Sequence, residues 1–255
     1  MKRHIPNFIT LLNVFSGCVA TVFAVLNQLE FAAIFVFLGI FFDFFDGLAA
    51  RLLDVRSELG VQLDSLADMI TSGLVPGIVM FQLINDAVDL NIMSSWEGTL
   101  YAFSSGSFDT NPNEIHFLGF FGFIITLASA YRLAKFNIDE NQVSSFIGLP
   151  TPANALLILS LPLILLYQNN EVLNEIILNQ WFLIGVTLLS AFLLNSKIEL
   201  FSFKLNNAGF KENGIKYLFL IGSLVLLLTM KFLAIPLIIA FYILASLAEK
   251  QFKTA

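Results

Sequence analysis

Cysteine, histidine and charged residues are all scarce in this chain. A single cysteine, Cys18, excludes a disulfide framework and a thiolate metal site. Only 13% of the residues are charged, and the net charge of −6 does not by itself suggest a nucleic-acid partner. No long apolar window shows the alternation typical of a membrane β-barrel strand.

Apolar side chains fill the chain instead. Of its 255 residues 57% are hydrophobic, 28 are phenylalanine, and the mean hydropathy is +0.82. A soluble protein of this size cannot bury so much apolar surface, which indicates a polytopic membrane protein. We predict an all-α bundle of about eight membrane helices, forming a single domain over residues 1–255. The predicted spans are 8–27, 31–53, 60–84, 117–136, 151–168, 179–195, 214–230 and 233–249.

The basic residues predict the orientation of these spans. With a cytoplasmic N-terminus, 12 of the 13 Lys and Arg residues fall in inside segments, and only Lys231 falls outside. The outer loops carry acidic residues instead, and the basic segment 197–216 predicts contact with anionic membrane lipids. We therefore expect an integral protein of the inner or plasma membrane with both termini in the cytoplasm.

Acidic residues gather at the facing ends of the second and third apolar segments. Asp43 and Asp46 are three residues apart, and Asp64 and Asp68 are four apart, so each pair lies on one helix face. An antiparallel hairpin would bring all four carboxylates together at the cytoplasmic end. An aspartate at the centre of a membrane helix costs roughly 2.5–3.5 kcal/mol, so such a group needs compensation. Clustered carboxylate oxygens suit Mg²⁺, Mn²⁺ or Ca²⁺, and no His or Cys nearby indicates zinc.

The pattern D-x-x-D-G-x-x-A-R, eight further residues, then G-x-x-x-D-x-x-x-D spans Asp43 to Asp68. It resembles the signature of the CDP-alcohol phosphotransferases. The resemblance implies a membrane enzyme, commonly a homodimer, that moves a phosphatidyl-type group from a CDP-linked lipid to an alcohol and releases CMP. It also implies two divalent cations, Mg²⁺ or Mn²⁺, with Asp43, Asp46 and Asp64 as core ligands. Asp68 would be a further ligand that faces the acceptor, and we predict that it is the general base.

The residues around the aspartates suggest how a nucleotide would fit. Gly47, Ala50 and Gly60 have minimal side chains, which leaves room for a nucleotide against both backbones. Arg51 would contact its phosphates or the cytidine. The four aspartates and Arg51 sum to −3, and two divalent cations would bring the site to +1, which attracts a diphosphate.

Asn7 and Thr10 follow Pro6 and lie one turn apart before the first span. They are either ordinary helix-start residues or, as the resemblance implies, residues near the nucleotide.

A second element narrows the resemblance. The run Arg132-Leu-Ala-Lys135-Phe-Asn137, followed by F-x-G-L-P-x-P-A from Phe146, resembles membrane-embedded phosphatidylserine synthases. This implies CDP-diacylglycerol and L-serine as substrates, with Arg132, Lys135 and Asn137 near the acceptor. Lys135 stands where many relatives have arginine. From the residues alone, the charged side chains of Arg132 and Lys135 could instead anchor their helix at the membrane interface.

Other functions stay open at this point. Within the family, glycerol 3-phosphate, inositol phosphate or choline could be the acceptor. An ion-coupled transporter or a prenyltransferase would also use membrane aspartates. Against a transporter, the aspartates cluster at one face rather than at the midplane, and the chain shows no internal repeat.

Overall fold

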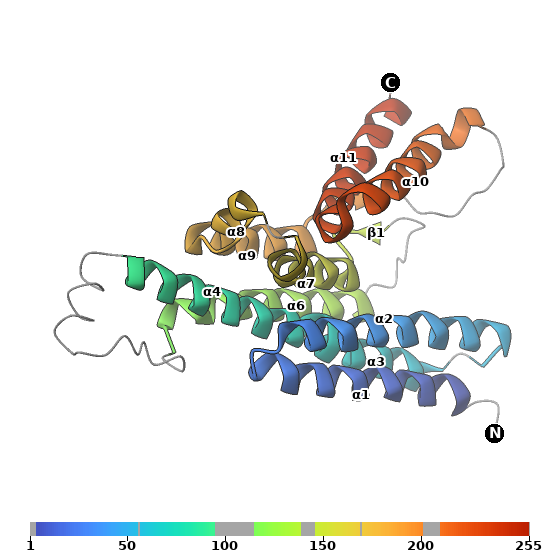
Figure 1. Ribbon diagram of the computed structural model, residues 1–255. Coiled ribbons are helices and arrows are strands. Elements are labelled where there is room, and N and C mark those ends of the chain that lie inside the picture. Colours follow the sequence, from blue (N-terminus) through green and yellow to red (C-terminus); the bar gives the residue numbers. More distant parts are fainter. Residues whose placement is uncertain are drawn as a thin grey trace.

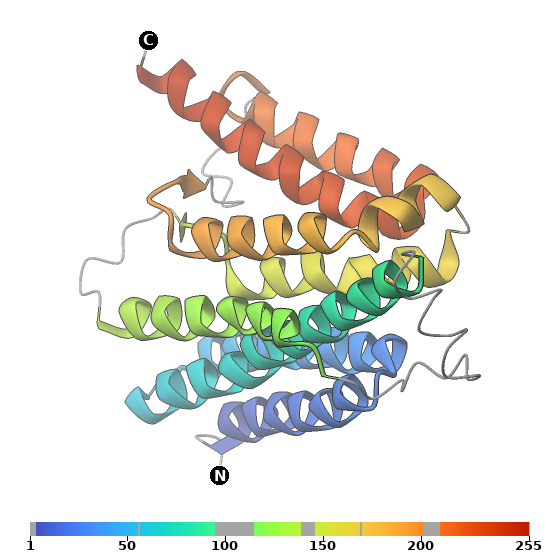
Figure 2. The same ribbon diagram turned by 90° about the vertical axis from the view of Figure 1, so that its left-hand side faces the viewer.

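The computed structural model describes residues 4–55, 57–94, 115–138, 146–168, 170–200 and 210–254. Helices make up nearly all of this part of the chain and lie side by side in one bundle (Figures 1 and 2). Most of the polar segment expected between the third and fourth spans lies outside the described residues.

The first two helices form an antiparallel hairpin. α1 (Ile5–Val25) starts with Pro6 in its first turn, and α2 is Leu29–Leu52. The turn between them passes through Asn27 at φ 55°, a left-handed conformation that asparagine tolerates. Ala24 and Ala32 are completely buried, because small side chains let the two backbones approach closely.

The third span is continuous but changes its winding. α3 (Glu58–Asp68) passes into a π-helical segment, η2 (Met69–Leu74), and then into α4 (Val75–Ser94). Pro76 lacks an N–H group and its ring would clash with the carbonyl of Ser72 in a regular α-helix, which disfavours regular winding at this point. The sequence predicts a kink at Pro76, and the structure accommodates the proline with the wider turn of η2 just before it.

Glycines pack α4 against the next helix. A short 3₁₀ segment, η3 (Phe117–Gly122), leads into α6 (Phe123–Ile138). A Cβ atom at Gly122 would lie 2.5 Å from the backbone nitrogen of Phe81. Thr126 Oγ1 donates to the carbonyl of Gly73 at 3.1 Å. The Gly73-x-x-x-Gly77 pattern therefore serves packing within the chain.

The remaining helices extend the bundle. α7 is Thr151–Tyr167, and α8 (Glu171–Ile177) is bent by 64° from α9 (Gln180–Asn195). α10 (Phe210–Met230) and α11 (Ala234–Thr254) are joined by η4 (Lys231–Leu233) and project from the other helices (Figure 1). They run antiparallel, since the ring of Phe219 lies 5.4 Å from that of Phe241.

The strands in the described residues are very short. β1 (Phe146–Ile147) pairs antiparallel with β2 (Glu199–Leu200) and ties the segment before α7 to the segment after α9. The sequence does not predict this pairing. It leaves the fold essentially all-α.

Five helices in the described part of the chain are long and apolar enough to cross a membrane, or up to six if the bent pair α8–α9 counts as one span. One of the five, Lys216–Glu249, covers most of the two helices α10 and α11, and the 17-residue α7 is shorter than the five. The prediction of a polytopic all-α bundle is confirmed, whereas the count of eight spans stays a prediction. The span that contains α3 and α4 is the most enclosed, with 67% of its apolar window buried.

Candidate active site

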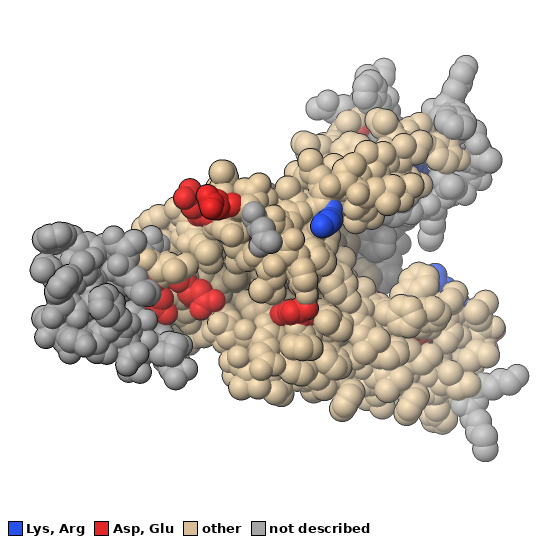
Figure 3. Space-filling view, viewed as in Figure 1, with Lys and Arg blue, Asp and Glu red and all other residues tan. Residues whose placement is uncertain are grey.

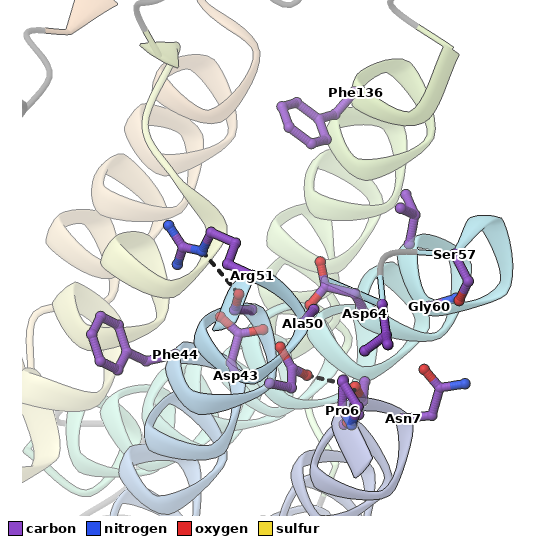
Figure 4. Close-up of a pocket in the computed structure, with 15 residues that line it drawn as sticks. Pro6, Asn7, Asp43, Phe44, Ala50, Arg51, Ser57, Gly60, Asp64 and Phe136 are labelled. Carbon is purple, nitrogen blue, oxygen red and sulfur yellow. Dashed lines mark hydrogen bonds between the residues drawn. The ribbon is translucent and has the colours of Figure 1, made fainter. Parts of the chain in front are cut away.

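Three aspartates meet where α2 ends and α3 begins. One carboxylate oxygen each from Asp43, Asp46 and Asp64 lie within 4.8 Å of one another. Figure 4 shows Asp43 and Asp64 facing a common space from these two helices. α1 packs against both α2 and α3, so its first turns close one side of this space. We call these residues the aspartate triad.

A hydroxyl group from α1 orients one member of the triad. Thr10 Oγ1 donates a hydrogen bond to Asp46 Oδ2 at 2.6 Å, and the carbonyl of Pro6 lies 3.1 Å from the same hydroxyl. Asp46 is only 5% exposed. Thr10 is thus more than a helix-start residue, because it holds a buried carboxylate.

The described residues offer the triad no basic partner. Among the described residues, no Lys or Arg lies within ion-pair distance of Asp43, Asp46 or Asp64. Arg51 is one turn away, but its Nε donates to the carbonyl of Gly47 at 2.9 Å. Two like charges 4 Å apart repel by about 4 kcal/mol at an effective dielectric constant of 20. The arrangement therefore favours a bound cation.

The donor atoms of the triad fit a hard divalent cation. All three ligands are carboxylates, and the group contains neither His nor Cys. Mg²⁺, Mn²⁺ and Ca²⁺ prefer such oxygen ligands, whereas zinc sites usually include nitrogen or sulfur. The triad would hold such an ion at the mouth of the α2–α3 hairpin.

A cleft of about 610 Å³ opens at the triad. Its walls come from the start of α1, the end of α2 and the start of α3 (Figure 4). All six residues that the sequence suggests for the CDP-lipid line it: Asn7, Thr10, Gly47, Ala50, Arg51 and Gly60. The cleft brings them together with the triad, while their contacts to a ligand stay predictions.

Other cleft residues were not selected from the sequence. They are Pro6, Phe44, Val55, Ser57, Val61 and Phe136. Ser57 carried a usable signal, because a serine just before a helix is a typical N-cap, and its Oγ accepts from the backbone nitrogen of Gly60 at 3.1 Å. Phe136 comes from α6, and only the tertiary structure shows that it reaches this space.

The absence of a side chain has a different consequence at each of the two glycines of the cleft. A Cβ atom at Gly60 would lie 3.2 Å from Ser57 Oγ and 3.3 Å from Asn7 Oδ1, so Gly60 lets α1 and α3 approach each other. A Cβ atom at Gly47 would meet only Arg51 Nη2, at 3.8 Å. Gly47 therefore borders open space in the cleft.

Asp68 lies one helical turn beyond Asp64 on α3. It does not line the cleft, and Thr151 Oγ1 at the start of α7 donates to its Oδ2 at 3.4 Å. Four residues of α-helix advance about 6 Å and turn about 40° past a full circle. Asp68 is therefore displaced from Asp64 both along and around α3. The structure brings Asp43, Asp46 and Asp64 together and gives Asp68 a contact with the start of α7, while the meeting of all four carboxylates stays a prediction.

The three residues suggested for the acceptor lie on α6, outside the cleft lining. Arg132 Nε donates to the carbonyl of Leu149 at 2.7 Å and supports the turn before α7. Lys135 is exposed. Asn137 accepts from Ser65 Oγ at 3.0 Å, which ties α6 to α3. Arg132 thus contacts the segment that leads into Thr151, the residue that donates to Asp68.

Comparison with known proteins agrees with this site. The family model described as CDP-alcohol phosphatidyltransferase matches residues 3–193, which include the triad, the cleft and Asp68 but not α10 and α11.

Several curated relatives carry the name CDP-diacylglycerol–serine O-phosphatidyltransferase. The Bacillus subtilis protein is 30% identical over 216 residues, covering 83% of this chain and 98% of that protein. The Methanocaldococcus jannaschii protein is 28% identical over 186 residues, covering 73% of this chain and 71% of that protein. The Saccharomyces cerevisiae protein is 29% identical over 174 residues, covering 62% and 53%. The chain thus belongs to the CDP-alcohol phosphatidyltransferase family.

Proposed function

We propose that this protein transfers the phosphatidyl group of CDP-diacylglycerol to the hydroxyl of L-serine, giving phosphatidylserine and CMP. The observation that carries the proposal is the aspartate triad at the mouth of a cleft whose lining includes Gly47, Ala50 and Gly60. Membership of the family supports the type of reaction, and the names of the relatives support the two substrates.

The triad would bind the cations on which the donor depends. Asp43, Asp46 and Asp64 would hold two divalent ions, Mg²⁺ or Mn²⁺, with Ca²⁺ as a possible occupant. Bound there, such ions supply positive charge that binds a diphosphate and stabilises the departing CMP. Thr10 keeps Asp46 in the orientation that this requires.

The cleft would hold the CDP part of the donor. Gly47 and Ala50 leave room on the α2 side, and Asn7 and Gly60 border the opposite wall. Arg51, whose side chain is exposed, can turn toward a phosphate. Phe44 lines the cleft and is 62% exposed, so this wall is open toward the apolar surroundings where acyl chains would lie.

Asp68 would act as the general base. Its position beside the triad, oriented by Thr151, suits a group that accepts the proton of the serine hydroxyl. The serine oxygen forms a bond to the phosphorus on the lipid side, and the bond from that phosphorus to the CMP oxygen breaks. The proton passes to Asp68.

The acceptor would be held beside Asp68. Arg132 uses two of its five N–H groups on the backbone of residues 148–149, so three are left for the carboxylate of serine. Lys135 and Asn137 would assist from the same helix, as the resemblance suggests. All these contacts are part of the proposal.

The location of the site is also proposed. The distribution of basic residues supports a cytoplasmic triad and cytoplasmic termini in the inner or plasma membrane. A homodimer among membrane lipids is the assembly we expect.

A single assay tests the reaction. Purified protein is supplied with CDP-diacylglycerol, Mg²⁺ or Mn²⁺, and a panel of L-serine, glycerol 3-phosphate, inositol phosphate and choline, and CMP release is measured. We expect CMP with L-serine. If CMP is released only with another alcohol, that alcohol is the acceptor in place of L-serine. If no alcohol leads to CMP release, the proposed function is overturned.

A further inference from the structure

Three helices meet at the level of Asp68. Thr151 Oγ1 at the start of α7 donates to Asp68 Oδ2 on α3 at 3.4 Å. Arg132 Nε on α6 donates to the carbonyl of Leu149, two residues before Thr151, at 2.7 Å. These contacts place α3, α6 and α7 around one carboxylate.

One turn deeper in the bundle, each of these helical segments carries a second polar residue. We call this set the lower polar layer: Ser72 on η2, Ser129 on α6 and Asn154 on α7. Each is three or four residues from Asp68, Arg132 or Thr151, and such spacings keep two residues on the same face of a helix. A Cβ atom at Gly73 would lie 3.1 Å from that of Ser129, so η2 and α6 touch at this depth.

The lower polar layer is covered but has no hydrogen-bond partners. Ser72, Ser129 and Asn154 are all 0% exposed. Within the described part of the chain, no partner is found for either hydroxyl or for the two amide atoms of Asn154. Buried polar groups nearly always have partners, because leaving them unpaired destabilises the fold. The layer is therefore incomplete by itself.

We propose that the lower polar layer is the inner wall of the acceptor site and that an amino-acid acceptor supplies its missing partners. This inference rests on the proposed function. L-serine enters beside Asp68, between η2, α6 and α7, with its hydroxyl toward Asp68. α7 must move slightly away from η2, since the layer is completely covered in this structure.

The donor and acceptor atoms of the layer match an acceptor that carries both a positive ammonium group and a negative carboxylate. The amide oxygen of Asn154 accepts from the ammonium group of serine, and its amide nitrogen donates to the carboxylate. The hydroxyls of Ser72 and Ser129 can donate or accept. An uncharged alcohol such as glycerol would satisfy fewer of these atoms, so the layer favours an amino acid.

The substitution Asn154→Leu tests this role, because leucine has a similar size and no polar atoms. We expect the KM for L-serine to rise at least tenfold, while the KM for CDP-diacylglycerol stays within twofold. The melting temperature without serine should equal or exceed that of the wild type, since an unpaired amide is removed. The rise in melting temperature on adding L-serine should be lost.

Ser190→Ala is the matched control. Ser190 on α9 is also 0% exposed with an unpaired hydroxyl, but it lies outside the layer. Its substitution should leave both KM values within twofold of the wild type. If Asn154→Leu does not fold, the double variant Ser72→Ala/Ser129→Ala removes only two oxygen atoms and is judged by the same measurements.

Two results would overturn the inference: a serine KM within twofold of the wild type, or an equal rise in both KM values. Failure of the proposed function looks different, because wild-type protein would then release CMP with another alcohol of the panel. The KM for that alcohol then decides the role of the layer in the same variants.

Discussion

Single hydrogen bonds position the carboxylates of the site. Thr10 holds Asp46, and Thr151 holds Asp68, in each case from a neighbouring helix. Groups that orient a metal ligand commonly affect metal affinity or activity by about 10–100-fold. The contribution of each hydroxyl can therefore be measured separately.

Thr10→Val keeps the shape of the side chain and removes its donor to Asp46. We expect the concentration of Mg²⁺ or Mn²⁺ needed for half-maximal CMP release to rise by about tenfold or more. Thr21→Val is the control, because the Thr21 hydroxyl donates to the Gly17 carbonyl of its own helix at 2.9 Å. An unchanged metal requirement in Thr10→Val would remove Thr10 from this role.

Asp64→Asn tests whether the triad binds metal through an equilibrium that needs no turnover. In EDTA, the variant should melt at or above the temperature of the wild type, because one of three mutually repelling charges is gone. Added Mn²⁺ should raise the melting temperature of the wild type, since a ligand that binds the folded state stabilises it. The variant should gain much less. A wild-type melting temperature that does not change on adding Mn²⁺ would contradict the metal site.

The substitution Asp68→Asn tests the general base independently of binding of the CDP-lipid donor. Because Asp68 lies outside the cleft lining, CDP-diacylglycerol should still bind with an affinity close to that of the wild type. Turnover should fall by about 10²–10⁴-fold, the usual contribution of a general base. Equilibrium binding and single-turnover CMP release distinguish the two effects. Normal turnover would assign the proton transfer to another group.

At the scale of helices, glycine contacts set how closely the segments approach. Gly77 and Gly122 bring α4 against η3 and α6, and Gly60 brings α3 against α1. These contacts hold α3, which carries Asp64, and α6, which carries Arg132, in one relative position. The geometry of the site thus depends on packing well away from the carboxylates.

Gly122→Ala should destabilise the protein, because the new Cβ would lie 2.5 Å from the backbone nitrogen of Phe81, which cannot move aside easily. Overpacking of this kind costs roughly 1–3 kcal/mol. Gly185→Ala on α9 is the control, since no atom lies within 4 Å of the added Cβ. It should be neutral or stabilising, because alanine favours helix. Thermal melting in detergent compares the two, and equal melting temperatures would contradict the packing role.

Across the whole molecule, the acidic residues divide between the two ends of the bundle. Glu171 and Asp86 belong to segments at the end opposite the triad, and one face of the molecule shows separate acidic patches in the space-filling view (Figure 3). His116 Nε2 lies 2.6 Å from Asp89 Oδ1 at that far end, so these two side chains form a pair. Among the described residues, Arg51, Arg132 and Lys135 lie in helical segments at the triad end.

A labelling experiment tests which end faces the cytoplasm. In a Cys18→Ser background, Glu58→Cys at the start of α3 and Val172→Cys on α8 place one thiol at each end, and both positions are exposed. A membrane-impermeant maleimide should label Val172→Cys in intact cells, and Glu58→Cys only after permeabilisation. The opposite pattern would reverse the proposed orientation.

Much of this protein follows from the sequence alone. Hydropathy predicts a polytopic helical bundle because each membrane helix satisfies its own backbone hydrogen bonds, whatever its neighbours are. The D-x-x-D and D-x-x-x-D spacings likewise select residues on one helix face, since helical periodicity is local. Local patterns therefore point to the four aspartates, whereas the family resemblance selects the triad among them and suggests residues such as Asn7 and Arg51 for the nucleotide.

Only the tertiary structure decided how these faces are turned toward one another. It places Thr151 of α7 against Asp68, brings Phe136 into the cleft, and shows that Ser72, Ser129 and Asn154 are covered without partners among the described residues. Such relations depend on the rotation and depth of each helix against residues distant in the chain. These are set by contacts such as Gly60 with Asn7, which no local pattern encodes.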